Sequence, residues 1–299
     1  MHRIIKKIVH FLQALLNTVP VGRMVDTKLI KEVEGYEQPI IILGIPRSGT
    51  TLLYQMLCFN YYTAYPTNFA ELMYSSPVVA TKISNYLPDS NNRYESSYGF
   101  TSGIKGPSEA TKLSRRWFEG AQVDVDRAKK EISAIKNIMG EVFVIKNLRL
   151  LLSIKKIQSH YPSALYIFVH RDEDEVCRSI YRARKKLYGS PKTWFGFDLP
   201  EVQKHGLSNP FEEIVSQVRT LKEYIAESQK MLSHKNYMTV EYRELCEHPN
   251  KVMESIEKFV AKRDLTLVRK DTFHVSKYKR QSRLLEVSNE NYLQKLLKQ

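Results

Sequence analysis

A glycine-bounded break in an apolar run constrains the fold more than any other feature of this sequence. The run Ile40–Leu43 has the β-branched composition of a buried strand, and it ends at Gly44. After Gly49 the apolar pattern resumes with helical spacing over Thr50–Cys58. A strand, a tight loop and a helix in this order bring backbone N–H groups and the positive end of a helix dipole to one point. The stretch therefore predicts an anion-binding loop.

The loop also contains the side chains that an anion site needs. Gly44 and Gly49 have the spacing of the phosphate-binding loop Gly-x-x-x-x-Gly-Lys-[Ser/Thr], but Thr50 occupies the lysine position. Arg47 supplies a cation earlier in the loop, and no strand clearly ends in an aspartate that would help to hold Mg²⁺. Hydroxyl groups come from Ser48, Thr50 and Thr51. We therefore expect an anion bound without a metal ion.

Strands and helices alternate along the rest of the chain. Further short β-branched runs are Val142–Ile145, Ala164–Val169 and Tyr237–Val240. Helical patterns are Val123–Ile138, Leu150–His160, Asp174–Leu187, Pro210–Leu232 and Asn250–Val260. This alternation predicts a single α/β domain over residues 36–299, with a central parallel sheet flanked by helices. Two weakly periodic segments, Ser75–Gly106 and Tyr188–Asn209, are expected to be binding loops or ordinary surface insertions.

Charge and cysteine content limit the partners. Lys and Arg outnumber Asp and Glu by 46 to 32, so the formal charge of +14 favours anionic partners. A nucleic acid, an anionic membrane surface and an anionic cosubstrate all fit, but the sequence contains no recognised nucleic-acid-binding motif. The cysteines Cys58, Cys177 and Cys246 have neither paired nor metal-ligating spacing. We expect a reducing, cytoplasmic location and no nucleic acid.

Residues 1–35 are predicted to form an N-terminal amphipathic helical segment. Between Ile4 and Leu16 apolar residues recur at helical spacing beside a basic face. The stretch never reaches the ~18–20 uninterrupted apolar residues that a spanning helix needs. We expect this helix to pack on its own domain, and peripheral contact with a membrane surface is the alternative.

Two motifs together resemble those of a known family. The loop "GIPRSGTTLL" is similar to the 5′-phosphosulfate loop of sulfotransferases that use 3′-phosphoadenosine 5′-phosphosulfate (PAPS), particularly the bacterial and tyrosylprotein sulfotransferases. The stretch "YPSALYIFVHRDEDEVCRSIYR" resembles their strand-to-helix element, which implies that Arg171 and Ser179 bind the 3′-phosphate. Asp172 and Glu175 form a capping-box-like helix start there, although Glu173 stands where the family often has Pro. Without the first motif, an arginine paired to a local carboxylate would be the simpler interpretation.

Weaker similarities extend the resemblance toward the C-terminus. The stretch "VFVIKNLRLLLSIKKIQSHYPSA" implies that Lys146 stabilises charge on the sulfuryl group and leaving phosphate, and a solvated strand-end lysine is the alternative. "YMTVEYRELCEHP" implies a nucleotide contact by Tyr242. "FHVSKYKRQSR" is similar to a loop that closes over the nucleotide, so Ser276 and Lys277 are binding candidates, and Ser276 is also a catalytic candidate.

The resemblance also implies a catalytic base. Glu71 lies about two dozen residues after the loop, near the position where the family places an acidic base, and a surface or capping glutamate is the alternative. His170 and Glu109 are the substitutes. The implied reaction is metal-free, in-line transfer from PAPS to an acceptor hydroxyl, with Arg47, Lys146 and Glu71 as catalytic residues. A nucleotide or small-molecule kinase and a basic nucleic-acid-binding protein are the alternative functions.

The acceptor remains open at this stage among glycan, lipid, peptide tyrosine and phenolic metabolite. Two groups of residues are candidates for lining its pocket, although aromatic clusters of this kind are common in protein cores. The candidates are Trp194, Phe195 and Phe197, and Arg115, Arg116 and Trp117.

Overall fold

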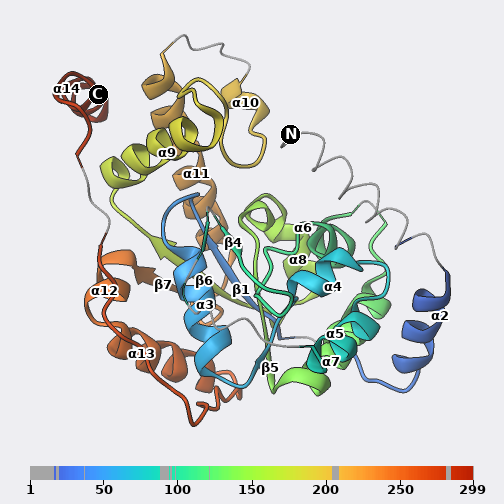
Figure 1. Cartoon of the computed structure of the whole chain (residues 1–299). Helices are drawn as coiled ribbons and strands as arrows, with labels where there is room; N and C mark the ends of the chain where they lie inside the picture. Colours follow the sequence, from blue (N-terminus) through green and yellow to red (C-terminus); the bar gives the residue numbers. More distant parts are fainter. Residues whose placement is uncertain are drawn as a thin grey trace.

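A parallel five-stranded sheet forms the centre of the molecule (Figure 1). The computed structural model describes residues 17, 20–36, 38–87, 94, 96–97, 99–120, 122–203, 209–280 and 284–298. The strands lie in the order β2-β5-β1-β6-β7, and every neighbouring pair is parallel. Their bounds are β1 (Ile40–Gly44), β2 (Thr63–Ala64), β5 (Val142–Lys146), β6 (Leu165–His170) and β7 (Tyr237–Glu241). The predicted α/β class and the predicted longer strands are confirmed.

Alternate residues of each strand enter two different cores. In β1, Ile41 and Leu43 join the core formed with helices α5 (Pro77–Asn85), α7 (Val125–Met139), α8 (Ile154–His160), α9 (Glu173–Tyr188) and α11 (Pro210–Met231). Ile40 and Ile42 join the core formed with α3 (Thr50–Asn60), α12 (Tyr242–Glu247) and α13 (Pro249–Ala261). Because helices cover both faces of the sheet, the strand sequences are continuous apolar runs, which is typical of parallel sheets. Figure 1 shows α12 and α13 on one side of the sheet and α5 and α7 on the other.

The crossovers place the functional ends of the strands together. β1 leads into α3, β5 into the 3₁₀ helix η2 (Leu148–Ser153), β6 into α9 and β7 into α12. Parallel strands connected in this way present their carboxyl ends, and the first residues of the following helices, at one edge of the sheet. This edge therefore carries the candidate site.

The segment Ser75–Gly106 contains more regular structure than the sequence suggested. Helix α5 occupies its first part, and a small hairpin, β3 (Ser96–Ser97) with β4 (Phe100–Thr101), follows. Asp26 of α2 (Pro20–Leu29) explains why the helix was missed, since its carboxylate accepts the backbone N–H groups of Val78 and Val79. The helix start is thus capped from a distant part of the chain, which no local pattern reveals.

The remaining described elements are short helices and one C-terminal helix. They are α4 (Asn68–Leu72), α6 (Thr111–Ser114), the π-helix η1 (Arg115–Glu119), α10 (Pro200–Gln203) and α14 (Val287–Leu297). The expected amphipathic helix between Ile4 and Leu16 lies outside the described residues. Among the residues described, no helix is both long and apolar enough to cross a membrane. The division between residues 1–35 and 36–299 stays a prediction.

Candidate active site

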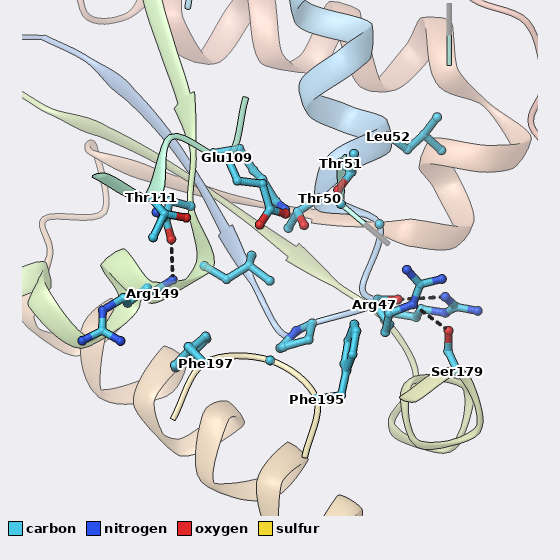
Figure 2. A pocket seen from close by; sticks show the side chains of 18 of the residues that line it. Arg47, Thr50, Thr51, Leu52, Glu109, Thr111, Arg149, Ser179, Phe195 and Phe197 are labelled. Carbon is cyan, nitrogen blue, oxygen red and sulfur yellow. Dashed lines mark hydrogen bonds and ion pairs between the residues drawn. The ribbon is translucent and has the colours of Figure 1, made fainter. Parts of the chain in front are cut away.

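A cavity of about 590 Å³ lies at the carboxyl ends of β1, β5 and β6. Its lining includes eight of the residues expected from the sequence to bind or transfer a ligand: Arg47, Gly49, Thr50, Thr51, Lys146, Arg171, Ser179 and Tyr242. Figure 2 shows Arg47 and Ser179 pointing toward each other at one end, while Thr111 and Arg149 lie at another. We call the end lined by Arg47, Arg171 and Ser179 the donor end and the end lined by Thr111 and Arg149 the acceptor end, after the roles that we propose for them.

The β1–α3 loop forms the donor end. Arg47 has a left-handed backbone (φ 74°), which is uncommon for a residue other than glycine and is often stored at functional sites. Gly49 is also left-handed (φ 103°), and a Cβ there would overlap the ring of Tyr242. Helix α3 begins at Thr50 without a side-chain cap, so its first N–H groups are directed at the cavity edge. This loop has the geometry of an anion cradle.

One hydroxyl in this loop has no hydrogen-bond partner among the described residues. Ser48 is 1% exposed and its Oγ is buried. Buried polar groups are normally paired, but Ser48 does not line the cavity, so its hydroxyl is not assigned to a ligand. Thr50, Thr51 and Arg47 do line it, and this set of N–H, hydroxyl and guanidinium groups suits the oxygens of an anion.

The second predicted motif meets the first in space. Arg47 Nε donates to Ser179 Oγ at 3.1 Å, and a terminal nitrogen of Arg171 donates to the Arg47 carbonyl at 2.9 Å. The guanidinium of Arg171 lies 4.3 Å from the ring centre of Tyr242, a cation–π contact. Residues more than 120 positions apart are thus joined at one end of the cavity.

The start of α9 differs from the expected capping box. Asp172 makes no side-chain capping hydrogen bond, and Glu175 Oε2 instead accepts from Arg171 Nε at 3.0 Å. Arg280 adds a second ion pair to Glu175 at 2.6 Å. Glu175 therefore orients Arg171 rather than the helix backbone.

Lys146 and Glu109 meet at the junction of the two ends. Lys146 is the last residue of β5, is 1% exposed and forms an ion pair with Glu109. Glu109 precedes the left-handed Ala110 (φ 50°) and packs against Gly99, where any Cβ would overlap its carboxylate. Figure 2 shows Glu109 beside Thr50 and Thr51. A carboxylate and an ammonium group thus stand next to the anion cradle.

Glu71, the base expected from the sequence, lies outside the cavity. Its carboxylate accepts the backbone N–H groups of Lys112 at 2.8 Å and Leu113 at 3.2 Å, and it does not line the cavity. Burial raises the pKa of Glu71 above its usual value, although the two backbone hydrogen bonds lower it. In this structure Glu71 therefore caps the start of helix α6, as in the alternative interpretation of the sequence.

Other candidates from the sequence also lie away from the cavity. His170 pairs with Glu241 at 2.7 Å and is exposed. Ser276 and Lys277 are exposed and do not line the cavity. From the same C-terminal segment, Tyr278 does line it. In this segment the residue that lines the cavity is therefore Tyr278 rather than Ser276 or Lys277.

The candidates for an acceptor pocket separate into two sets. Phe195, Phe197 and Arg115 line the cavity, and Figure 2 shows Phe195 beside Arg47 and Phe197 nearer to Arg149. Trp117 is fully buried, and its Nε1 donates to Glu131. Arg116 is paired with the same Glu131. The core interpretation holds for Trp117, because its indole is packed inside the fold.

Several cavity residues were not identified from the sequence. They are Thr111, Asn147, Arg149, Lys186, Tyr188 and Tyr278. Asn147 and Arg149 directly follow the Lys146 strand end, and this adjacency is the signal that could have indicated them. Within the described part of the chain, no group of three or more His, Cys, Asp or Glu side chains could hold a metal ion.

Comparisons with known proteins identify the family. A sulfotransferase family model matches residues 39–262, which is more than half of the chain. The structure is similar to sulfotransferase STF9 from Mycobacterium avium, at 14% identity and a TM-score of 0.51, over 80% of this chain and 67% of that chain. It is also similar to sulfotransferase STF1 from Mycobacterium tuberculosis H37Rv, at 15% identity and a TM-score of 0.50, over 82% and 74%. These two likenesses show the fold. No curated protein matches significantly. Because the family match spans the strand–loop–helix that builds the cavity, the chain belongs to the sulfotransferase family.

Proposed function

We propose that this protein transfers a sulfuryl group from PAPS to a hydroxyl group of an acceptor, without a metal ion. The observation that carries the proposal is the contact of Arg47 with Ser179 and Arg171, which joins two anion-binding motifs at one cavity. A nucleotide with phosphate groups at both its 5′ and 3′ positions needs two such sites. The family assignment supports the same reaction class.

The donor end supplies the binding groups. Arg47, the first N–H groups of α3 and the hydroxyl groups of Thr50 and Thr51 hold the 5′-phosphosulfate. Arg171 and Ser179 hold the 3′-phosphate, and Tyr242 supports the Arg171 guanidinium through their stacking contact. These assignments leave Ser276 and Lys277 without a role.

Glu109 and Lys146, which lie where the two ends of the cavity meet, take part in the transfer itself. The acceptor hydroxyl oxygen attacks sulfur, and the bond from sulfur to the bridging phosphate oxygen breaks, so that 3′-phosphoadenosine 5′-phosphate leaves. Glu109 accepts the hydroxyl proton. Lys146 and Arg47 stabilise the charge that develops on the leaving phosphate. Glu109 takes this role, in place of Glu71, because only Glu109 lines the cavity.

The alternative functions have less support. A P-loop kinase needs a lysine that reaches the β- and γ-phosphates, and Thr50 occupies that position. Nucleic-acid binding is supported by net charge alone. Neither alternative accounts for the family match.

Calorimetry of PAPS binding tests the proposal. Arg47→Ala should weaken PAPS binding by about ten- to hundredfold, because a hydrogen bond to a charged group contributes about 1.5–3 kcal/mol. Arg23→Ala is the matched control, since Arg23 is exposed on α2 and does not line the cavity. A folded Arg47→Ala protein that binds PAPS as tightly as the parent would rule out the loop as the donor site.

A further inference from the structure

The acceptor end of the cavity presents a cation that the fold itself does not neutralise. Arg115 is exposed, lines the cavity and has no side-chain hydrogen bond or ion pair to any residue that the structure describes. Its neighbour Arg116 is directed to the opposite side, where it contacts the Tyr74 carbonyl and the buried Glu131. Two adjacent arginines therefore have different surroundings: one stabilises the core and the other faces the cavity.

The π-helix η1 produces this separation. The Gly120 N–H donates to the Arg115 carbonyl, a bond across five residues that widens the turn. Trp117 and Phe118 are then fully buried, while Arg115 stays at the cavity surface. A π-turn costs helical regularity and is frequently found at functional sites.

The charge near Arg115 is predominantly positive. Arg149 also lines the acceptor end and is paired through Nε with Glu119 at 2.9 Å. The carboxylate of Glu109 is already paired with Lys146. Like charges that share a cavity repel one another, and an anionic ligand relieves that repulsion. The two carboxylates on this side, Glu109 and Glu119, are thus each paired with another cation and not with Arg115.

A buried amide adds a second unsatisfied donor beside these cations. Asn147 is 5% exposed and lines the cavity, and its Oδ1 accepts the Arg149 backbone N–H at 3.0 Å. This hydrogen bond fixes the orientation of the amide, and its Nδ2 has no partner among the described residues. An orphan N–H donor of this kind fits a ligand oxygen.

The donor nucleotide does not account for these groups. In the sheet order β2-β5-β1-β6-β7, Asn147 and Arg149 follow β5, on one side of the β1 loop. The pair Arg171 and Ser179, proposed to bind the 3′-phosphate, follows β6 on the other side. The two sets of donors are therefore separated by the loop that holds the phosphosulfate.

A fixed aromatic wall lies in the same cavity. The Phe195 carbonyl accepts from Gln217 Nε2 at 2.8 Å, and the Phe197 carbonyl accepts from Trp194 Nε1 at 3.1 Å. These hydrogen bonds hold the 194–197 loop in place, with Phe195 and Phe197 along the cavity (Figure 2). Aromatic faces of this kind pack against flat rings.

We propose that the acceptor is an acid: a ring compound that carries both the reacting hydroxyl and a carboxylate, with the carboxylate bound by Arg115 and Asn147. This inference rests on the proposed function and names its substrate class. Bidentate pairing of a guanidinium with a carboxylate provides both attraction and orientation. The ring packs on Phe195 and Phe197, so that the hydroxyl is directed toward Glu109.

Binding of matched probe pairs tests the inference without turnover. The probes are 4-hydroxyphenylacetate against 4-hydroxyphenylacetamide, and methyl glucuronide against methyl glucoside, each titrated with 3′-phosphoadenosine 5′-phosphate present. In at least one pair the acid should bind about ten- to hundredfold more tightly. The pair with the larger preference distinguishes a phenolic ring from a sugar ring.

Variants of Arg115 test whether this residue causes the tighter binding of the acid probe. Arg115→Ala should abolish it and Arg115→Lys should retain part of it, while the surface variant Arg23→Ala should leave it unchanged. Equal binding of acid and neutral probe in both pairs would overturn the inference. A preference that survives in a folded Arg115→Ala protein would also overturn it.

Sulfuryl transfer to the same probes separates this inference from the proposed function. An acid preference that depends on Arg115, together with no transfer from bound PAPS to any hydroxyl compound, would count against the proposed function alone. Transfer to neutral and acidic probes with equal efficiency would uphold sulfuryl transfer and overturn the acidic acceptor.

Discussion

The two ends of the cavity are built in different ways. The donor end consists of two strand–loop–helix units, β1 with α3 and β6 with α9, in which Arg47 and Arg171 closely follow a strand end and Ser179 lies on the next helix. The acceptor end combines residues from 109–115 and 147–149 with Phe197, all from loops and short helices. The contrast shows that anion binding is encoded by local backbone geometry, whereas the acceptor end depends on contacts between distant segments.

Replacement of Glu109 should have the largest effect, and it acts where the two ends meet. Glu109→Gln keeps the shape of the side chain but cannot accept a proton, so turnover should fall by roughly 10²–10⁴. PAPS affinity, measured by calorimetry, should stay near the parent value. Glu71→Gln is the matched control, because its carboxylate caps α6 and does not line the cavity. If Glu71→Gln loses turnover and Glu109→Gln does not, the base assignment is reversed.

Arg171→Ala should have a smaller effect that is confined to the donor end. PAPS should bind about ten- to hundredfold more weakly, because a charged hydrogen bond to the 3′-phosphate is lost. An analogue that lacks the 3′-phosphate should bind the parent and the variant with equal affinity. Equal losses of affinity for both nucleotides would show that Arg171 does not contact the 3′-phosphate. The hydrogen bond from Arg171 Nε to Glu175 Oε2 at 3.0 Å would then have a purely structural role.

Glu71→Gln should have the smallest effect, and it concerns the stability of the acceptor end. The substitution weakens one of two hydrogen bonds to the start of α6, which at neutral pH should cost about 1 kcal/mol in the free energy of unfolding. Urea unfolding measures this cost. A loss of stability in the variant at neutral pH would support the structural role of Glu71, and an unchanged midpoint would contradict it.

The pH dependence of the same variant sharpens the test. Because burial raises the pKa of Glu71, the folded state retains this proton to higher pH than the unfolded state. The contribution of this group to stability is therefore greatest at acid pH and falls as pH rises through the folded-state pKa. Because the glutamine of Glu71→Gln cannot ionise, the free energy of unfolding of the variant should lack the part of the pH dependence that Glu71 contributes. Parallel stability–pH curves for parent and variant would contradict the assignment.

Most of the residues that the sequence assigned to anion binding lie at one cavity because their signals are local. Arg47, Arg171 and Ser179 stand at strand ends or one helical face, and the strand and helix patterns around them were confirmed by the fold. The contact between Arg47 and Ser179 could not be read from spacing, because it depends on β1 and β6 pairing side by side.

The acceptor end was predicted only in part, for a physical reason. Glu71 and Glu109 both lie outside the strands and helices predicted from the sequence, and their surroundings decide their roles. Glu109 faces the cavity since Ala110 is left-handed and Gly99 leaves room for the carboxylate. Neither feature follows from the local sequence. Arg115 and Arg116 show the same limit, because the π-turn directs adjacent arginines to opposite sides.

Sulfuryl transfer in an extract of the source cells tests the central claim most directly. The extract is incubated with parent protein and PAPS, and mass spectrometry follows the masses of its hydroxyl compounds. We expect at least one compound to gain a single sulfuryl group with the parent, and this gain to fall by roughly 10²–10⁴ with Glu109→Gln. A gain of a phosphoryl group from ATP and Mg²⁺, with no sulfuryl gain from PAPS, would contradict the account.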